Sequence, residues 1–386
     1  MQNLFPVSTF SVICRFTAML ALTWLYCGTV IGQDSREEFD RELAEWRQML
    51  MEAREAGLRY FVSDREGSIE IREKYEDLAK RGYQQMEVLI PLAMKALDEM
   101  DEPDDELIEF ITRIQNKHYY DGQYAQSVAL GERLLAIDSD IRVANMINGR
   151  ASVLVNRFPE AYEFALNNSK LIDSFTQTEK NLFSYLPMLI EKHQREMKFQ
   201  EADKNNDLPQ VEIRTTKGTI VLELFEDQAP ETVGNFINLL ESGFYSETYF
   251  HRVIRQFMAQ GGGFTATSSG KPVKKDPGYR IHDECNLPNS RHHFRGVISM
   301  ANTGEPNSGS SQFFLTTVPV PGLDGKHTVF GRVLSGMDVV DKINVTFTAG
   351  TEEQPSAEIP GAVQDKILST RVIRKRDHDY KPNKIK

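Results

Sequence analysis

Five short blocks in the second half of the 386-residue chain combine apolar side chains with hydrogen-bonding ones. Residues of these types can hold a ligand by apolar contact and by directed hydrogen bonds, so they are the strongest functional candidates in the sequence. In chain order the blocks are Phe250-His251-Arg252, Phe257-Met258-Ala259-Gln260-Gly261-Gly262, Ser299-Met300-Ala301-Asn302, Ser311-Gln312-Phe313-Phe314 and Leu323-Asp324-Gly325-Lys326-His327.

Other familiar chemistries find less support. Gly270-Lys271 lacks a glycine five positions earlier and is followed by Pro272, so it is not a phosphate-binding loop. Ser299 and Ser311 do not lie in the sequence context of a nucleophile elbow. No pair of carboxylates in the sequence stands out as a candidate for acid-base catalysis. The spacing of four residues matches no common zinc finger, so we interpret them as solvated loop residues and not as zinc ligands. They are His282, Cys285, His292 and His293. We expect neither a metal nor a cofactor.

In this order and spacing, the five blocks resemble the cyclophilin-type peptidyl-prolyl cis/trans isomerases, from about Val211 to Lys375. The resemblance implies an enzyme that accelerates rotation about X-Pro bonds in proline-containing polypeptides. That rotation must overcome a barrier of roughly 18–20 kcal/mol set by amide resonance, and it needs no covalent intermediate. As the bond twists, the imide nitrogen regains a lone pair to which a fixed guanidinium can donate. The resemblance assigns this catalytic role to Arg252.

The same resemblance implies nine substrate-binding residues. Four form an apolar pocket for the proline ring: Phe257, Met258, Phe314 and Leu323. The other five surround the bound segment: Gln260 holds the arginine and the substrate backbone, Ala301 and Asn302 pair with the substrate main chain, Gln312 lies in the same binding set, and His327 lies at the rim. We interpret His251 as structural, because neighbouring strand residues point to opposite faces.

The sequence departs from the family at Gly322. Many cyclophilins carry an aromatic residue, often Trp, just before Leu-Asp-Gly-Lys-His. Glycine at this position puts tight binding of cyclosporin in doubt and would widen the outer wall of the proline pocket. It leaves the proposed guanidinium donor in place.

These residues need a scaffold of short strands, and residues 209–375 predict one. Val211–Thr215 and Thr219–Leu224 flank a Lys-Gly turn as in a β-hairpin. A helix follows from Pro230 toward Gly243, with proline early and glycine late. Further short apolar strands are separated by Gly-rich loops. We therefore predict a closed antiparallel β-barrel with one or two covering helices.

Residues 34–200 predict an all-α region, because helix-forming residues dominate and Gly and Pro are sparse. Phe39, Leu43, Trp46 and Leu50 fall at helical spacing and predict a buried stripe. The segment beginning at Tyr124 aligns with the one beginning at Phe158 at an offset of 34 residues, which resembles tetratricopeptide repeats. Such a region would bind a protein partner, whereas a generic helical bundle would act as a spacer or a dimerisation unit. Residues 201–208 are predicted to be a linker.

Residues 1–32 predict a signal peptide, since an uncharged apolar run follows Arg15 and ends before a polar stretch. An uncleaved membrane anchor is the alternative, and only then would the protein contact a membrane. Either interpretation predicts an exported protein, periplasmic or anchored and facing outside the cytoplasm. Cleavage would leave Cys285 as the single cysteine and exclude an intrachain disulfide.

Composition fits a multidomain globular protein, with 40% hydrophobic and 26% charged residues. The formal net charge of −11 argues against a nucleic-acid partner that is bound through overall basicity. Residues 376–386 form a basic tail that we expect to be solvated. The leading hypothesis is an isomerase that assists the folding of exported proteins, and the alternatives are a proline-segment binding or chaperone module, or a scaffold.

Overall fold

The computed structural model describes residues 33–62, 68–100, 102–266, 272–350 and 355–385. The predicted signal peptide or anchor, residues 1–32, lies outside these ranges. Within the ranges, no helix is both long enough and apolar enough to cross a membrane. The chain divides into two compact units, of which the first ends at Ile114 and the second begins at Gln115.

The first unit is built on two long helices, α2 (Gln33–Val62) and α3 (Ser68–Glu99), and on the beginning of α4 (Asp105–Tyr120). Phe39, Leu43 and Trp46 are buried on α2, which confirms most of the predicted stripe. The Trp46 indole Nε1 donates to the carbonyl of Gly82 on α3, 3.1 Å away. The stripe therefore contacts α3 through this hydrogen bond and α4 through Phe110, whose ring meets Phe39 and Trp46 edge to face.

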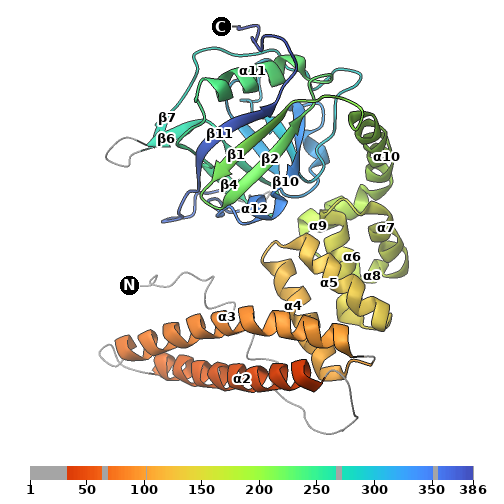
Figure 1. The fold of residues 1–386 in the computed structure, drawn as a ribbon, viewed down its shortest axis with the longest axis vertical. Helices are drawn as coiled ribbons and strands as arrows, with labels where there is room; N and C mark the ends of the chain where they lie inside the picture. The colour runs from red at the N-terminus through yellow and green to blue at the C-terminus, as the bar shows by residue number, and fades with distance from the viewer. Residues whose placement is uncertain (1–32, 63–67, 101, 267–271, 351–354, 386) are drawn as a thin grey trace. The chain divides into compact units, whose positions relative to one another are not determined.

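The second unit begins with further helices, so the predicted helical region ahead of a β-barrel is confirmed (Figure 1). They are α5 (Tyr124–Ile137), α6 (Arg142–Leu154), α7 (Phe158–Asn167), α8 (Ser169–Ile172), α9 (Gln177–Ser184) and α10 (Leu186–Asp203). Helices α5 and α7 begin at the two aromatic residues of the predicted repeat, Tyr124 and Phe158, and both side chains are buried.

The described part of the barrel contains one nine-stranded antiparallel sheet and a two-stranded ribbon. The sheet order is β3-β11-β1-β2-β10-β8-β9-β5-β4. Its strands are β1 (Gln210–Thr215), β2 (Gly218–Leu224), β3 (Thr248–Tyr249), β4 (Arg252–Ile254), β5 (Met258–Gly261), β8 (Val297–Met300), β9 (Phe313–Thr316), β10 (Val329–Ser335) and β11 (Lys366–Arg374). The ribbon pairs β6 (Phe264–Ala266) with β7 (Pro272–Lys274).

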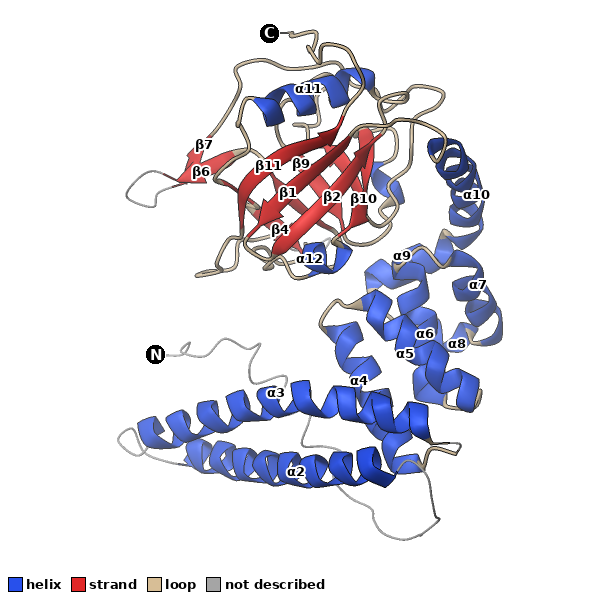
Figure 2. Ribbon diagram, viewed as in Figure 1, coloured by secondary structure: helices blue, strands red, loops and turns tan. Residues whose placement is uncertain are grey.

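The barrel closes through the chain itself. The two edge strands of the sheet, β3 and β4, are consecutive in sequence and are separated only by Phe250 and His251. The predicted hairpin is confirmed as β1 and β2, with Thr215 opposite Gly218. Helix α11 (Pro230–Glu241) lies at one end of the barrel and α12 (Met337–Asp341) at the other (Figure 2). The short 3₁₀ helix η1 (Pro321–Leu323) ends at the first residue of the last sequence block.

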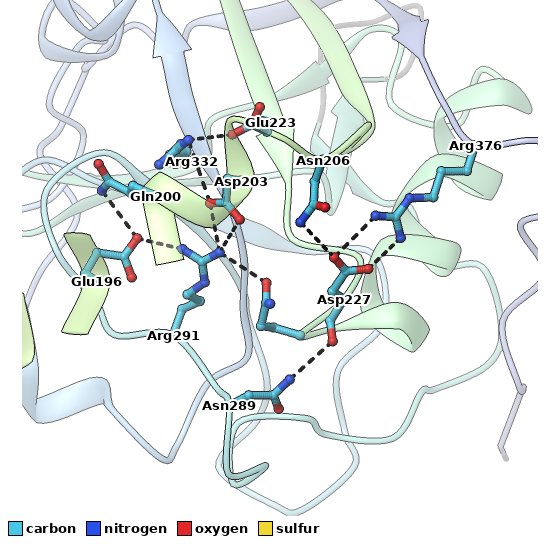
Figure 3. Close-up of polar contacts among 11 residues, drawn as sticks. Glu196, Gln200, Asp203, Asn206, Glu223, Asp227, Asn289, Arg291, Arg332 and Arg376 are labelled. Carbon is cyan, nitrogen blue, oxygen red and sulfur yellow. Dashed lines mark hydrogen bonds and ion pairs between the residues drawn. The ribbon is translucent and has the colours of Figure 1, made fainter. Parts of the chain in front are cut away.

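Helix α10 is held on the barrel by a buried arginine (Figure 3). The side chain of Arg291 is 0% exposed and donates to Glu196 at 2.9 Å and to Asp203 at 2.8 Å, both on α10. Its guanidinium also lies over the ring of Phe225, 4.0 Å from the centroid. Helix α10 continues to Asp203, three residues into the predicted linker 201–208, and its last residue makes this contact.

The predicted basic tail keeps most of its side chains exposed, and a few of its residues pack against the barrel. Tyr380 is 5% exposed, and its hydroxyl donates to Glu226 at 2.9 Å. Arg376 pairs with Asp227 at 2.6 Å, as Figure 3 shows, and Ile385 forms a bridge with Arg280. Counting charges alone gave no weight to the one large aromatic side chain, whose burial fixes the tail against the barrel.

Candidate functional site

A row of paired residues crosses four neighbouring strands. Arg252 on β4 lies opposite Gln260 on β5, Gln260 lies opposite Phe314 on β9, and Phe314 lies opposite Ser299 on β8. Directly opposite residues of antiparallel strands project to the same face of a sheet. Strand register alone therefore brings Arg252, Gln260 and Phe314 together, although 62 residues separate the first from the last.

The opposite face of the same strands belongs to the barrel core. The residues that alternate with the row are buried in the main apolar cluster of the barrel, among them Val253, Ala259, Leu315 and Ile298. Side chains alternate between faces with a period of two, so a strand that faces the core on one side offers its other side to a ligand. The barrel core thus fixes the position of the row.

A small apolar cluster adjoins the row. Ile254, Met258 and Phe314 are buried in it, and four partly buried side chains pack against them: Phe257, Ala301, Leu323 and Phe347. The structure therefore brings together all four residues predicted for the proline pocket. Ile254 and Phe347 were missed by the sequence analysis. Ile254 shares a strand with Arg252, but Phe347 has no local signal and reaches the site through a bridge to Ile254.

Arg252 has no acidic partner among the described residues. Its guanidinium lies over the ring of Phe347, 5.9 Å from the centroid. Burial lowers the pKa of Arg252, and no carboxylate acts in the opposite direction. An arginine stays charged in this setting, so its N–H donors remain available to a ligand beside the apolar cluster.

Two hydrogen-bonded glutamines belong to the site, and one of them, Gln260, lies opposite Arg252. Gln260 Nε2 donates to Gln312 Oε1 at 2.9 Å, which joins two predicted substrate-binding residues. A β-carbon at Gly263 would lie 2.4 Å from the side chain of Gln312, so only glycine leaves room for it there. This hydrogen bond uses the amide nitrogen of Gln260 and fixes the orientation of the amide group. The side-chain oxygen of Gln260 is not used in it and remains an acceptor on the face that carries Arg252.

The remaining predicted residues line the loops that follow β8 and η1. Asn302 Nδ2 donates to the carbonyl of Lys326 at 2.8 Å. His327 Nδ1 lies 3.0 Å from the carbonyl of Met300, and burial lowers the pKa of its imidazole. The neutral ring therefore donates from Nδ1 and presents Nε2 to its surroundings. The rings of Phe314 and His327 meet edge to face at 5.4 Å.

Two further positions differ in character from the row. His251 lies against Phe264, with 4.5 Å between ring centroids, and burial lowers its pKa to about 4. Gly322 is exposed, and a β-carbon added there would have no heavy atom of the described residues within 4 Å. The side of the site beside η1 is accordingly open.

Within the described residues, no three His, Cys, Asp or Glu side chains form a metal-binding group.

Comparison with known proteins identifies the domain. Residues 210–367 match the family model "Cyclophilin type peptidyl-prolyl cis-trans isomerase/CLD". The chain is 44% identical over 167 residues to peptidyl-prolyl cis-trans isomerase-like 1 of Neurospora crassa, covering 43% of this chain and 96% of that protein. It is 39% identical over 165 residues to peptidyl-prolyl cis-trans isomerase CYP18-2 of Arabidopsis thaliana, covering 43% and 94%. The chain therefore belongs to the cyclophilin-type peptidyl-prolyl cis-trans isomerases, and residues 210–367 are its isomerase domain.

Proposed function

We propose that Arg252 is the catalytic residue and that the apolar cluster beside it holds the proline ring. The observation that carries this proposal is the strand row that sets Arg252, which has no acidic partner among the described residues, on the same face as Phe314 with Gln260 between them. A guanidinium held there donates to the imide nitrogen more strongly as the X-Pro bond twists, so it stabilises the twisted state over the planar one. Gln260 orients the guanidinium, and Asn302, Gln312 and His327 border the bound chain.

The test is X-Pro isomerisation in a model peptide, followed with the full chain and with Arg252→Ala. Removing a donor that acts only in the twisted state should lower kcat about 10²- to 10³-fold, with little change in KM. Arg255→Ala provides a matched control, because Arg255 is an exposed arginine on the same segment. Equal activity of wild type and Arg252→Ala would overturn the assignment.

The same proposal extends to the rest of the chain. We infer that residues 1–32 direct export, that the enzyme assists folding of exported proteins, and that the helical region binds a protein partner in the manner of tetratricopeptide repeats. The support is the apolar run after Arg15 and the 34-residue offset between Tyr124 and Phe158. Mass spectrometry of the mature protein from an exporting host tests the first step, since cleavage after Gly32 predicts a chain that begins at Gln33.

A second candidate function is a proline-segment binding module in which turnover is incidental. Gly322 favours it, because the open side beside η1 can admit an extended segment. Suppression of client aggregation that survives Arg252→Ala would support binding as the main role. Loss of suppression together with turnover would support the enzyme alone.

A further inference from the structure

Helix α10 contacts the isomerase domain at a second place besides Arg291. Lys192 Nζ lies 2.7 Å from Asp324 Oδ2, and the two side chains are only 25% and 14% exposed. Asp324 belongs to the block Leu323-Asp324-Gly325-Lys326-His327, which borders the site. A residue of the helical region is thus the ion-pair partner of a carboxylate next to two proposed substrate-binding residues.

The other oxygen of Asp324 holds His293. Asp324 Oδ1 accepts from the backbone N–H of His293 at 2.8 Å and lies 2.9 Å from its Nδ1. His293 Nε2 lies 2.9 Å from Ser299 Oγ on β8. The His293 side chain is 0% exposed, and burial lowers its pKa. A neutral ring that donates from Nδ1 to Asp324 has an acceptor at Nε2 for the Ser299 hydroxyl, and the carbonyl of Thr328, 3.0 Å from Oγ, competes for the same proton.

The His293 ring supports Phe314. The two rings are stacked, with 5.9 Å between centroids and 12° between planes. His293 also meets His327 edge to face at 6.4 Å. The orientation of one buried imidazole, set by its two hydrogen bonds, therefore determines the surface on which Phe314 rests.

Ser299, His293 and Asp324 have the connectivity of a nucleophilic triad, but the hydroxyl is inaccessible. Ser299 is 0% exposed and lies beside Phe314 in the strand row. No substrate carbonyl can approach Oγ without displacing Phe314, so this arrangement orients an imidazole instead of activating a nucleophile.

We propose that Lys192 is a positioning residue of the isomerase: through Asp324 and His293 it fixes the aromatic wall formed by Phe314. The inference rests on the proposed contact between Phe314 and the proline ring. Removing Lys192 leaves Asp324 partly buried without its cation. The carboxylate must then move to a new position or gain proton density through its hydrogen bond with His293. Either response changes the hydrogen bonds of His293 and the stacking beneath Phe314. Helix α10 is then part of the working enzyme.

The Arg291 contact makes Lys192 testable by itself. Arg291, Glu196 and Asp203 hold α10 on the barrel without involving Lys192. The experiment uses the full chain with Lys192→Met, and Arg195→Met is the matched control. Arg195 lies one turn along α10 and donates to the carbonyl of Pro288 at 2.5 Å, outside the chain of contacts to Phe314. Lys192→Arg tests rescue, because it keeps the cation.

We expect Lys192→Met to raise KM for an X-Pro peptide about three- to tenfold with kcat nearly unchanged, since Phe314 would contact the ring in both the planar and the twisted states. The side-chain ¹⁵N shifts of His293 should change in Lys192→Met but not in Arg195→Met, and Lys192→Arg should restore both readouts. Matching KM values and His293 shifts in Lys192→Met and Arg195→Met would overturn the inference. Arg252→Ala, measured in parallel, reports separately on the proposed catalytic site, because its loss is expected in kcat.

Discussion

Two arginines of the isomerase domain meet opposite surroundings. The side chain of Arg291 is fully buried, donates to two carboxylates and to Gln228, and lies over the rings of Phe225 and Phe199. Arg252 is partly buried beside Phe347 and pairs with no carboxylate among the described residues. Burial alone does not distinguish a structural arginine from a working one, whereas the satisfaction of its donors does. Donors already bound to carboxylates cannot strengthen their bonds to a substrate as its bond twists.

The largest effect is expected at Arg291, whose terminal N–H groups bind buried carboxylates. Arg291→Met should lower the free energy of unfolding by about 3–5 kcal/mol, because it leaves Glu196 and Asp203 buried without their cation. Urea unfolding of the full chain measures this loss. Arg371→Met is the control, since the Arg371–Glu212 pair is solvent-exposed on the arginine side and should contribute less than about 1 kcal/mol. Equal losses in the two variants would show that Arg291 is not the structural contact we describe.

The comparison can be sharpened by giving Arg252 a carboxylate partner, which Arg291 already has. Gln260→Glu places a carboxylate directly opposite Arg252 in the strand register. We expect kcat/KM to fall about tenfold although Arg252 is retained, because the ion pair competes with the substrate for the guanidinium donors. Gln260→Met removes the same hydrogen bond to Gln312 without adding charge, and it should cost less activity. A smaller loss in Gln260→Glu than in Gln260→Met would contradict this account of the site.

A third effect concerns the histidine beside Arg252. The pKa of His251 is about 4 in the folded protein because burial disfavours its charged form, against about 6.5 in an unfolded chain. The unfolded state therefore binds the extra proton first, and folding stability falls as the pH drops from about 6.5 to 4. We expect His251 to contribute about 1–2 kcal/mol to this fall, after allowance for its partial exposure. Above pH 6.5, His251 does not contribute to the pH dependence of folding stability.

Chemical unfolding of wild type and His251→Gln across pH 4–7 measures that contribution. The variant should show the shallower dependence, and identical slopes would exclude His251 as the titrating group. The neutral imidazole also matters for the comparison, since it adds no second positive charge next to Arg252.

The sequence predicted the parts of the site that lie on strands far better than the contacts between distant segments. The resemblance of the five blocks to the cyclophilin family led to Arg252, Met258 and Phe314, and alternation along short strands then places such residues on one face. Phe347 and Lys192 carry no comparable pattern. Each reaches the site by tertiary packing over long sequence separations, Phe347 through a bridge to Ile254 and Lys192 through Asp324.

The same limit applies to the domain boundary. A polar run at residues 201–208 predicts a linker, but Asp203 ends α10 and binds Arg291. The compact units divide at Ile114 and Gln115 instead, within the helix α4. Polarity marked this segment as solvated because a sequence does not show that a distant arginine supplies its partner.

The smallest effect is expected on the open side of the site. Gly322 is exposed, has an ordinary negative-φ backbone, and leaves space where a β-carbon would stand. Gly322→Trp should therefore change the free energy of unfolding by no more than about 0.5 kcal/mol. An indole beside Leu323 should lower KM for an X-Pro peptide two- to threefold with kcat unchanged, because added apolar contact stabilises the planar and twisted states alike. Gly322→Ala adds the backbone restriction without the ring and should leave KM unchanged. A rise in kcat in Gly322→Trp would contradict the division of labour argued here, since only the arginine side of the site is expected to distinguish the twisted bond from the planar one.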